Sequence, residues 1–145
     1  MPLYDRPVST IMRREFASLH PDDRLDLAEQ MMKVGRVRHL PVLGPDGHVV
    51  GIVSSRDLLE ASLSSVLDLD PASRRGFLRS VAVADVMRPE VETVAESTSL
   101  LGAASRMIRH RIGCLPIVGP DGVMTGLVTE TDLLIAAYLP EPAPR

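Results

Sequence analysis

The chain repeats itself at a spacing of 75 residues, and this repeat restricts its fold more than any other feature. GIVSSRDLL at 51–59 returns as GLVTETDLL at 126–134 (126 − 51 = 75). The register holds without a gap between 8–61 and 83–136, and both copies contain the tetrapeptide GPDG. Because self-similarity at a fixed period indicates repeated structural units, the sequence predicts two copies of one fold.

The first half of each copy predicts a short extended segment, ASLH or ETVA, followed by an amphipathic helix. Apolar residues at i, i+3 and i+7 share one helical face, namely Leu25, Ala28 and Met32 in the first copy and Leu100, Ala103 and Met107 in the second. Asp22-Asp23 and Ser97-Thr98-Ser99 offer side-chain oxygens for the helix N-caps. Gly35 can end the first helix with a positive φ, although His110 stands at this position in the second copy.

The second half of each copy predicts a β-hairpin and a second helix. The prolines of LPVL and LPIV, Pro41 and Pro116, favour a sheet edge or a strand start. GPDG supplies turn residues, and VVGIV or MTGLV forms the second strand. Since a half of about 54 residues buries too little surface alone, we expect an α/β (α+β) protein. Its two β-α-β-β-α repeats are expected to pack with pseudo-twofold symmetry.

The repeats also set the expected domain boundaries. Residues 1–61 form the first repeat and residues 83–139 the second. The segment 62–82 joins them as a linker that is helical in part and breaks at Asp70-Pro71. The proline-rich end, 140–145, is expected to be a flexible tail.

Composition excludes several classes of function. A net charge of −3 and only 3% aromatic residues argue against binding to nucleic acid. A single cysteine, Cys114, rules out an internal disulfide and fits a reducing compartment. The N-terminus lacks the apolar region of a signal peptide, and no apolar run approaches the ~20 residues of a membrane span. We therefore expect a cytoplasmic protein without membrane contact.

The repeated hydroxyl-x-x-Asp segments, Ser54 to Asp57 and Thr129 to Asp132, have two interpretations. A hydroxyl followed three residues later by an acid resembles a capping box, which contributes about 1 kcal/mol to helix stability. Alternatively, a carboxylate at a helix N-terminus can accept hydrogen bonds from a ribose diol, and the free amides there attract phosphate. A glycine, Gly51 or Gly126, lies three residues before each hydroxyl and lets another group approach the strand. Basic residues precede each hairpin: Arg36, Arg38 and His39 in one copy, and Arg109, His110 and Arg111 in the other.

These motifs together resemble a known family. VSTIM and VADVM, LPVLGPDG and LPIVGPDG, and the GIVSSRDLL and GLVTETDLL endings are similar to a tandem pair of cystathionine-β-synthase-type (CBS) domains, the arrangement called a Bateman module. The resemblance covers nearly the whole chain. It implies binding of adenosine-containing ligands (AMP, ADP, ATP, S-adenosylmethionine or NADH) in two clefts between the repeats. It also implies regulation of an attached or partner protein.

The resemblance assigns expected roles residue by residue. Asp57 and Asp132 match the ribose-binding aspartate, and Ser54 and Thr129 match the hydroxyl that contacts ribose or phosphate. The remaining candidates fall into two sets: a phosphate and base wall of Arg36, Arg38, His39, Arg56, Arg111, Gly113, Cys114 and Thr131, and weaker base-pocket candidates Thr10, Met12, Asp85 and Met87. The opening methionines are also readily explained as core residues.

The second copy departs from the pattern at the phosphate contact. Arg56 matches a frequent phosphate ligand, but Thr131 stands at that position in the second copy, with the acidic Glu130 beside it. A charge-assisted hydrogen bond contributes about 1.5–3 kcal/mol. We therefore expect the two clefts to differ, with the Arg56 cleft preferring phosphorylated adenosine, unless Arg56 is a solvated surface arginine.

Other chemistry has little support. Cys114 is expected to be a buried structural thiol. The four histidines (His20, His39, His48 and His110) show no metal-ligand spacing, so no metal site and no prosthetic group are expected, although Mg²⁺ can accompany a polyphosphate. No nucleophile with a positioned base and no Walker-type loop is present, so we do not expect an enzyme.

Three hypotheses about function remain. The first is a regulatory module that senses an adenosine nucleotide; the second is a protein-interaction or dimerisation module with degenerate, ligand-free clefts. The third is a fragment of a larger enzyme or channel, against which the initial methionine favours a free-standing protein. The resemblance implies a homodimer that forms through the exposed faces of the final helices, after Leu59 and Leu134. The regulated partner is unknown.

Overall fold

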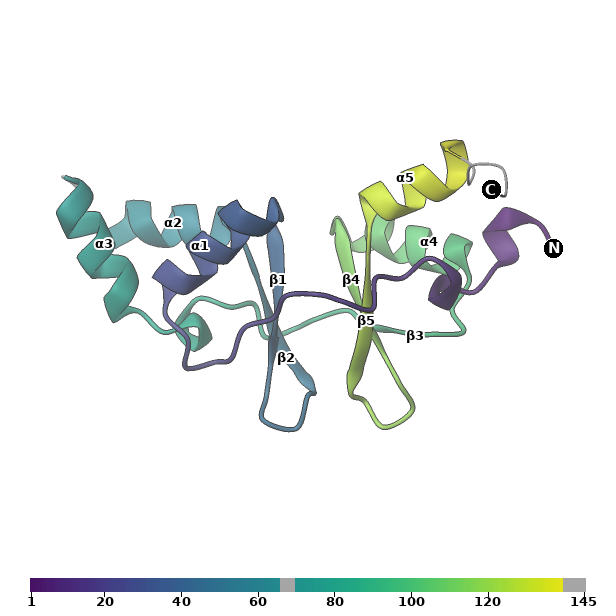
Figure 1. Ribbon diagram of the computed structural model, residues 1–145, viewed down its shortest axis with the longest axis horizontal. Helices are drawn as coiled ribbons and strands as arrows, with labels where there is room; N and C mark the ends of the chain where they lie inside the picture. Colours follow the sequence, from purple (N-terminus) through teal and green to yellow (C-terminus); the bar gives the residue numbers. More distant parts are fainter. Residues whose placement is uncertain (66–69, 140–145) are drawn as a thin grey trace. The chain divides into compact units, whose positions relative to one another are not determined.

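The computed structural model describes residues 1–65 and 70–139, and within them the chain is a mixed α+β protein (Figure 1). Its elements are η1 (Leu3–Asp5), η2 (Val8–Thr10), α1 (Leu25–Gly35), β1 (His39–Leu43), β2 (Val49–Ser54), α2 (Ser55–Ser65), α3 (Pro71–Ser80), η3 (Val83–Asp85), β3 (Val94–Ala95), α4 (Leu100–His110), β4 (Cys114–Val118), β5 (Met124–Thr129) and α5 (Glu130–Tyr138). The expected tail, 140–145, and residues 66–69 of the expected linker lie outside the described residues. None of the described helices is both long and apolar enough to cross a bilayer.

The chain forms two compact units, and each unit combines parts of both repeats. Unit 2 contains residues 17–91, whereas unit 1 contains residues 1–16 and the chain from residue 92 onward. The opening segment of each repeat therefore packs on the hairpin of the other repeat. In unit 1, Arg13 and Leu127 exchange two backbone hydrogen bonds of 2.8 and 3.0 Å; in unit 2, Arg88 and Ile52 do the same at 2.9 and 3.0 Å.

Each unit is built on the expected hairpin. In unit 2, β1 pairs antiparallel with β2; in unit 1, β4 pairs antiparallel with β5, and β3 adds a parallel strand on its other side. The GPDG turns are confirmed, with Gly47 at φ 85° and Gly122 at φ 83°. Pro116 lies inside the central strand β4, so the expected edge or first position is wrong there. The sheet tolerates this proline because β3 pairs only with Ile117 and Val118.

The helix ends agree only in part with the expectation. Ser99 caps α4, because its Oγ accepts a 3.0 Å hydrogen bond from Gly102 N–H. The expected Asp22-Asp23 cap is wrong: Arg24 is the N-cap residue of α1, and Asp23 instead accepts a hydrogen bond from His20 N–H at 2.7 Å.

The C-terminal ends of α1 and α4 also differ from the expectation. Gly35 is still helical, and the left-handed residue comes one position later: Arg36 (φ 52°) ends α1 and Arg111 (φ 54°) ends α4. The glycine is therefore not the residue that ends the helix. A left-handed conformation costs a non-glycine residue about 1–2 kcal/mol, and both repeats place an arginine in it.

The apolar stripes of both first helices are buried as expected. Leu25, Ala28 and Met32 belong to the core of unit 2, and their counterparts Leu100, Ala103 and Met107 belong to the core of unit 1. The hairpins supply the other half of each core: Leu40, Val42 and Val53 in unit 2, and Leu115, Ile117 and Val128 in unit 1. Each unit thus has its own apolar interior.

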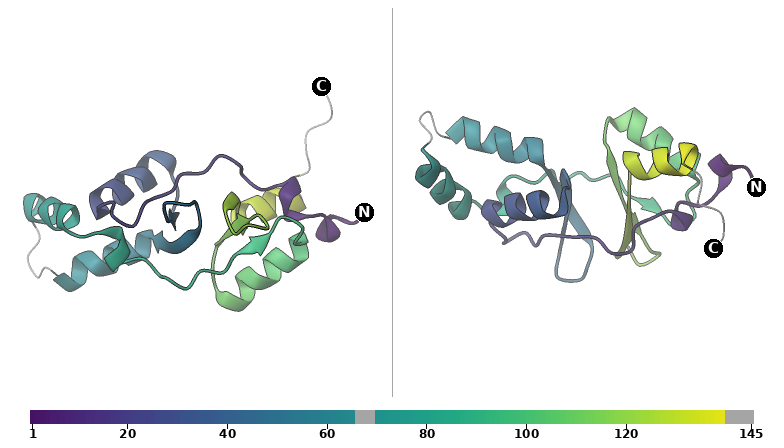
Figure 2. Two further views of the ribbon diagram at one scale, coloured as in Figure 1. Left: turned by 90° about the horizontal axis from the view of Figure 1, so that it is seen from below. Right: turned by 45° about the horizontal axis from the view of Figure 1, so that its top comes forward.

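Part of the expected linker contributes to the core of unit 2. Asp70 caps α3 by accepting a 2.7 Å hydrogen bond from Ser73 N–H, and α3 packs against α1 and α2 (Figure 2). Leu78 on α3 is only 1% exposed. Its counterpart in unit 1 is Leu3 (78 − 3 = 75), so the repeat register extends further toward the N-terminus than Val8.

Candidate functional site

In unit 2, Asp57 lies at the point where β2 ends and α2 begins. Its Oδ2 accepts a 2.8 Å hydrogen bond from Ser54 N–H, while Ser54 Oγ accepts one of 3.1 Å from Asp57 N–H. This reciprocal pair is the capping box that the spacing predicted. Asp57 Oδ1 accepts a third hydrogen bond from Arg88 Nε at 3.1 Å, and the aspartate is 7% exposed.

In unit 1, Asp132 has the corresponding arrangement at the start of α5. Its Oδ2 accepts from Thr129 N–H at 2.9 Å, and Thr129 Oγ1 accepts from Asp132 N–H at 3.2 Å. Asp132 Oδ1 accepts a hydrogen bond from Arg13 Nε at 3.0 Å, and a terminal nitrogen of the same guanidinium group lies 2.9 Å from this oxygen as an ion pair. Both predicted aspartates are therefore helix caps that also hold an arginine from the opening segment of the other repeat.

The two carboxylates differ in their remaining capacity to accept hydrogen bonds. A carboxylate offers about four lone-pair sites. Asp57 uses one site on each oxygen, so one acceptor stays available on Oδ1 and one on Oδ2. At Asp132, Oδ1 accepts from Arg13 Nε at 3.0 Å and also lies 2.9 Å from a second guanidinium nitrogen, so the arginine crowds this oxygen more than Arg88 Nε, at 3.1 Å, crowds Asp57 Oδ1. Asp57 is thus better suited to hold two neighbouring hydroxyl groups.

The strand glycines that precede these sites, Gly51 and Gly126, leave room for a methionine side chain to pack against the strand. A Cβ on Gly51 would overlap the side chain of Met87, and a Cβ on Gly126 would lie 2.6 Å from Met12 Sδ. The sequence correctly predicted a close approach at both positions, but the group that approaches is the opening methionine of the other repeat. Met12 is buried in the core of unit 1 and Met87 packs against that of unit 2, which agrees with the interpretation of both as core residues.

The basic candidates of unit 2 come from three segments: the end of α1, the start of β1 and the first turn of α2. Arg36, Arg38 and Arg56 are exposed, and His39 is half-buried at the start of β1, where it pairs with Ser54. Arg38 is tied to the site through its backbone, because its carbonyl accepts a 2.8 Å hydrogen bond from Ser55 N–H. All three arginines are therefore exposed, and Arg38 and Arg56 belong to segments that adjoin the capped aspartate.

The same positions in unit 1 carry a different set of side chains. Arg111 and Thr131 are exposed, and Gly113 accepts a 3.0 Å hydrogen bond from Glu130 N–H through its carbonyl. The Glu130 carboxylate folds back over Gly113, and a Cβ added there would lie 3.1 Å from Glu130 Oε1. An acid thus covers the position where Arg38 stands in unit 2 (113 − 38 = 75).

Cys114 is confirmed as a buried thiol. It is 3% exposed in β4 and pairs with Thr129 across the hairpin. Burial, reinforced by the negative charge of Asp132, raises the pKa of the Cys114 thiol to about 12. The thiol therefore stays protonated at neutral pH, and its low exposure gives no support for a nucleophilic role.

The two weaker candidates outside the core lie on short 3₁₀ turns. Thr10 in η2 is exposed and donates a 2.7 Å hydrogen bond from Oγ1 to the Pro7 carbonyl. Asp85, at the same position of η3, is also exposed.

The sequence reasoning missed three residues of these sites. Arg13 and Arg88 bind the aspartates, and Glu130 covers Gly113. A signal for the arginines was present, because each follows its opening methionine at the same offset of 75 residues (88 − 13 = 75).

Comparisons with known proteins agree with this architecture. A CBS domain-containing protein of Dictyostelium discoideum is 30% identical over 138 residues, which cover 94% of this chain and 95% of that protein. The crystal structure of CBSX2 in complex with AMP has a TM-score of 0.77 at 25% identity and covers 92% of this chain and 97% of that one. Homoserine O-acetyltransferase of Methanosarcina acetivorans is 28% identical over 126 residues, but the match spans 87% of this chain and only 21% of the enzyme.

The family model agrees with both repeats of the sequence. The model described as CBS domain matches residues 8–64 and again residues 83–138, and the two matches together cover most of the chain. The internal duplication, the paired hairpins and the two capped aspartates therefore have one explanation. The chain belongs to the CBS domain family and contains two CBS domains in tandem.

Proposed function

We propose that this protein is a regulatory module that binds an adenosine nucleotide at the start of α2, where Asp57 holds the ribose. The observation that carries this proposal is the state of the Asp57 carboxylate, which is fixed by Ser54 and Arg88 and keeps one acceptor on each oxygen. Two vicinal ribose hydroxyls match such a pair of acceptors. The similarity to CBSX2, which was crystallised with AMP, supports the choice of ligand class.

Positive charge near this site favours a phosphorylated ligand. The N-terminus of α2 presents free amides and the positive end of a helix dipole. Arg38 and Arg56 are exposed on the adjoining segments and can turn toward a phosphate. A charge-assisted hydrogen bond from one guanidinium group contributes about 1.5–3 kcal/mol, or roughly ten- to hundredfold in affinity. Mg²⁺ would then accompany a polyphosphate such as ATP.

The site at the start of α5 is proposed to bind such ligands weakly. Two guanidinium nitrogens of Arg13 lie 3.0 and 2.9 Å from Asp132 Oδ1, and Glu130 places a second carboxylate beside Gly113. A phosphate there would meet a negative charge where unit 2 offers arginine. We expect this second site to prefer an adenosine ligand without phosphate.

Regulation would use the arginine that already contacts the aspartate. Arg88 belongs to the opening segment of the second repeat but pairs with Asp57 of the first, and its side chain is 63% exposed. A ribose that binds Asp57 competes with this ion pair or adds to it, so ligand binding and the attachment of the opening segment are linked. A ligand that prefers one of two arrangements shifts their populations, which a regulated partner protein can then detect.

Isothermal titration calorimetry of the full chain with AMP, ATP, S-adenosylmethionine and adenosine tests the proposal. We expect Asp57→Asn to weaken AMP and adenosine alike by tenfold or more, because it keeps an oxygen for the cap but removes the charge. Arg56→Ala should weaken AMP ten- to hundredfold and leave adenosine unchanged. Thr131→Ala at the matching position of unit 1 is the control and should leave AMP binding unaltered.

Two results would contradict the proposal. If none of the four compounds binds, the clefts are degenerate and the chain is a protein-interaction module. If AMP binds but Asp57→Asn leaves its affinity unchanged, the aspartate acts only as a helix cap.

A further inference from the structure

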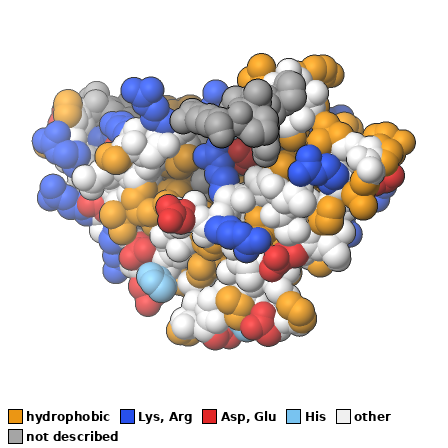
Figure 3. All heavy atoms as spheres, turned by 45° about the vertical axis from the view of Figure 1, so that its right-hand side comes forward, with side chains coloured by type: hydrophobic (Ala, Val, Ile, Leu, Met, Phe, Trp, Pro, Cys, Tyr) orange, Lys and Arg blue, Asp and Glu red, His pale blue; other side chains and the backbone are white. Residues whose placement is uncertain are grey.

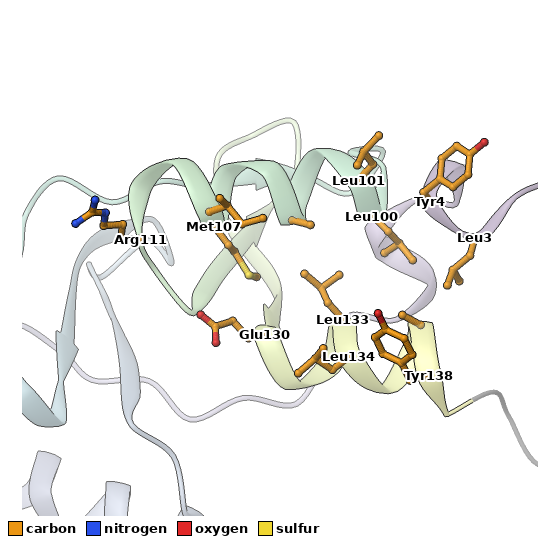
Figure 4. A pocket seen from close by; sticks show the side chains of 13 residues that line it. Leu3, Tyr4, Leu100, Leu101, Met107, Arg111, Glu130, Leu133, Leu134 and Tyr138 are labelled. Carbon is orange, nitrogen blue, oxygen red and sulfur yellow. The ribbon is translucent and has the colours of Figure 1, made fainter.

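Unit 1 has an open apolar groove between α4 and α5, which encloses about 740 Å³ (Figure 4). Sites for small organic ligands typically enclose about 300–1,000 Å³ and combine apolar walls with a few polar groups. Four large apolar side chains that line the groove are unusually exposed: Leu101, Ile108, Leu134 and Tyr138. The space-filling view, which brings the unit 1 side forward, shows hydrophobic side chains at the surface there (Figure 3). The groove therefore has the volume and the walls of a ligand site.

The matching face of unit 2 is charged and carries a helix. On the outward stripe of the first helix, Asp26, Glu29 and Lys33 of α1 stand where α4 has Leu101, Ala104 and Ile108, 75 residues later. Arg74 on α3 donates hydrogen bonds to both carboxylate oxygens of Glu29, which helps to hold α3 against α1. The positions that face the two cores are apolar in both helices. The apolar wall is therefore a property of the α4 surface and does not follow from the shared fold.

One end of the groove is polar. Arg111 and Glu130 lie at this end, whereas Tyr4 and Tyr138 lie at the other (Figure 4). Within residues 1–65 and 70–139, no carboxylate pairs with the Arg111 side chain, and the Glu130 carboxylate folds over Gly113. A guanidinium group without an anionic partner, at the end of an apolar groove, is complementary to an anion that carries a hydrophobic chain.

The neighbouring charges favour an anion at this end as well. The last turns of α4 are partly neutralised, because Glu92 pairs with Arg106 at 3.1 Å and with His110 at 2.9 Å. Arg109 is exposed beside Arg111, and these two cations outnumber the one acid of the rim. A carboxylate head group is therefore attracted to this end, whereas a quaternary ammonium head group is repelled.

We propose that the groove binds a free long-chain carboxylate such as a fatty acid, with its chain along the α4–α5 wall and its head group against Arg111. The wall removes the chain from water, which is worth about fourfold in affinity for each buried methylene group. The guanidinium group offers two parallel donors to the carboxylate. A sugar or a nucleotide fits less well, because its polar groups would lie against the apolar wall without partners. This site is separate from the proposed nucleotide site of unit 2, so either proposal can fail without the other.

Isothermal titration calorimetry of the full chain with dodecanoate, kept below its critical micelle concentration, tests the proposal. We expect one molecule to bind per chain. Ile108→Glu should weaken binding at least tenfold, because the alkyl chain would then lie against a charge. Val34→Glu on α1 is the matched control, since Val34 and Ile108 are both 79% exposed. It should leave the affinity unchanged, and circular dichroism should show both variants folded.

Variation of the head group and of Arg111 tests the polar end of the groove. Arg111→Gln should weaken dodecanoate about tenfold or more, because a charge-assisted hydrogen bond is lost, and should leave the binding of dodecanol unchanged. Arg36→Gln is the matched control, because Arg36 ends α1 in the same left-handed conformation. Dodecyltrimethylammonium, which has the same chain length and the opposite charge, should bind at least tenfold more weakly than dodecanoate.

Tyrosine fluorescence gives a readout that is local to the groove. The chain has two tyrosines and no tryptophan, and both Tyr4 and Tyr138 line the groove. Quenching by acrylamide should therefore weaken as dodecanoate saturates the wild-type protein. At the same dodecanoate concentrations this protection should be lost in Ile108→Glu.

Three results would overturn the proposal. If dodecanoate shows no saturable binding, or if dodecyltrimethylammonium binds as tightly, the groove does not select a long-chain anion. If vesicles of phosphatidylglycerol bind the chain while free dodecanoate does not, a membrane surface is the occupant. If sedimentation equilibrium shows a wild-type dimer that Ile108→Glu dissociates, and dodecanoate does not bind, a second copy of the chain fills the groove.

Discussion

Units 1 and 2 share one fold and differ mainly in what lies on its surface. The buried stripes Leu25–Met32 and Leu100–Met107 hold equivalent positions, as do the two hairpins and the two capped aspartates. The outward stripe, the residues beside the aspartate and the cover of the first helix all differ. The two copies therefore keep equivalent residues in the core, while their surface residues differ.

We expect the largest difference in stability between the two units to come from the segment that covers the first helix, which is α3 in unit 2 and η1 in unit 1. Leu78 on α3 is almost fully buried, whereas its counterpart Leu3 lines the open groove and is only partly buried. Truncating a buried leucine costs about 2–5 kcal/mol, through lost transfer energy and the cavity left behind. We expect Leu78→Ala to lower the free energy of unfolding by this amount and Leu3→Ala to lower it by less than about 1.5 kcal/mol. Urea denaturation followed by circular dichroism measures both.

The two leucine variants also test whether α3 belongs to the folded unit. Equal and small losses in both would mean that α3 is only loosely attached, and the contrast between the covers of the two units would disappear. A large loss in Leu78→Ala with unchanged AMP binding would separate the structural role of α3 from the nucleotide site.

Much of this fold could be predicted from the sequence because of the internal repeat. Periodicity placed the buried faces of α1 and α4, and GPDG placed both hairpin turns, because these depend on local patterns. Helix ends were harder to predict, since Arg36 takes a left-handed conformation that the sequence gives no reason to assign to arginine. The helix α3 was expected only as a partly helical linker, because its packing against α1 depends on tertiary contacts.

The site followed the same division between local and long-range information. The caps at Asp57 and Asp132 follow from spacing within one turn and were predicted as one of two interpretations. Their partners Arg88 and Arg13 lie 31 and 119 residues away in the sequence, and no local sequence pattern predicts contacts over such separations. The exchange of opening segments between the repeats brings them together, and no single repeat contains that information.

The strand glycines offer the next test, with an intermediate effect. An added Cβ at Gly126 would lie 3.1 Å from the Arg13 carbonyl oxygen, which a hydrogen bond from Leu127 N–H holds in place. At Gly51 the nearest atoms all belong to the Met87 side chain. Overpacking costs about 1–3 kcal/mol, so we expect Gly126→Ala to approach the upper value and Gly51→Ala to stay nearer the lower one. Thermal unfolding of both variants measures the difference, and an equal loss would contradict the assigned role of the backbone oxygen.

The left-handed arginines should respond alike in both units. Arg36→Gly and Arg111→Gly relieve a conformation that costs about 1–2 kcal/mol, but glycine also gains entropy in the unfolded chain. We expect a net stabilisation of about 1 kcal/mol in each variant, read from the midpoint of urea unfolding. If AMP affinity falls in Arg36→Gly alone, the Arg36 side chain contributes to the nucleotide site of unit 2. Destabilisation of either variant would mean that the arginine side chain contributes more than the strain removes.

The smallest effect concerns alkaline pH and should be confined to unit 1, because Cys114 has His39 as its counterpart in unit 2. Burial raises the pKa of the folded thiol from 9.0 to about 12. Between these values the unfolded chain releases the thiol proton and the folded chain keeps it, so stability is fully present below pH 9 and falls as the pH rises. At pH 9.5 the loss should be a little under about 1 kcal/mol.

Denaturation of wild type and Cys114→Ala at pH 7.5 and 9.5 measures this loss. Because all other titrating groups are the same in both proteins, their contributions cancel when the two changes in unfolding free energy are subtracted. An identical pH dependence in both proteins would show that the thiol titrates alike in the folded and unfolded chains, and would remove this contrast between the two units.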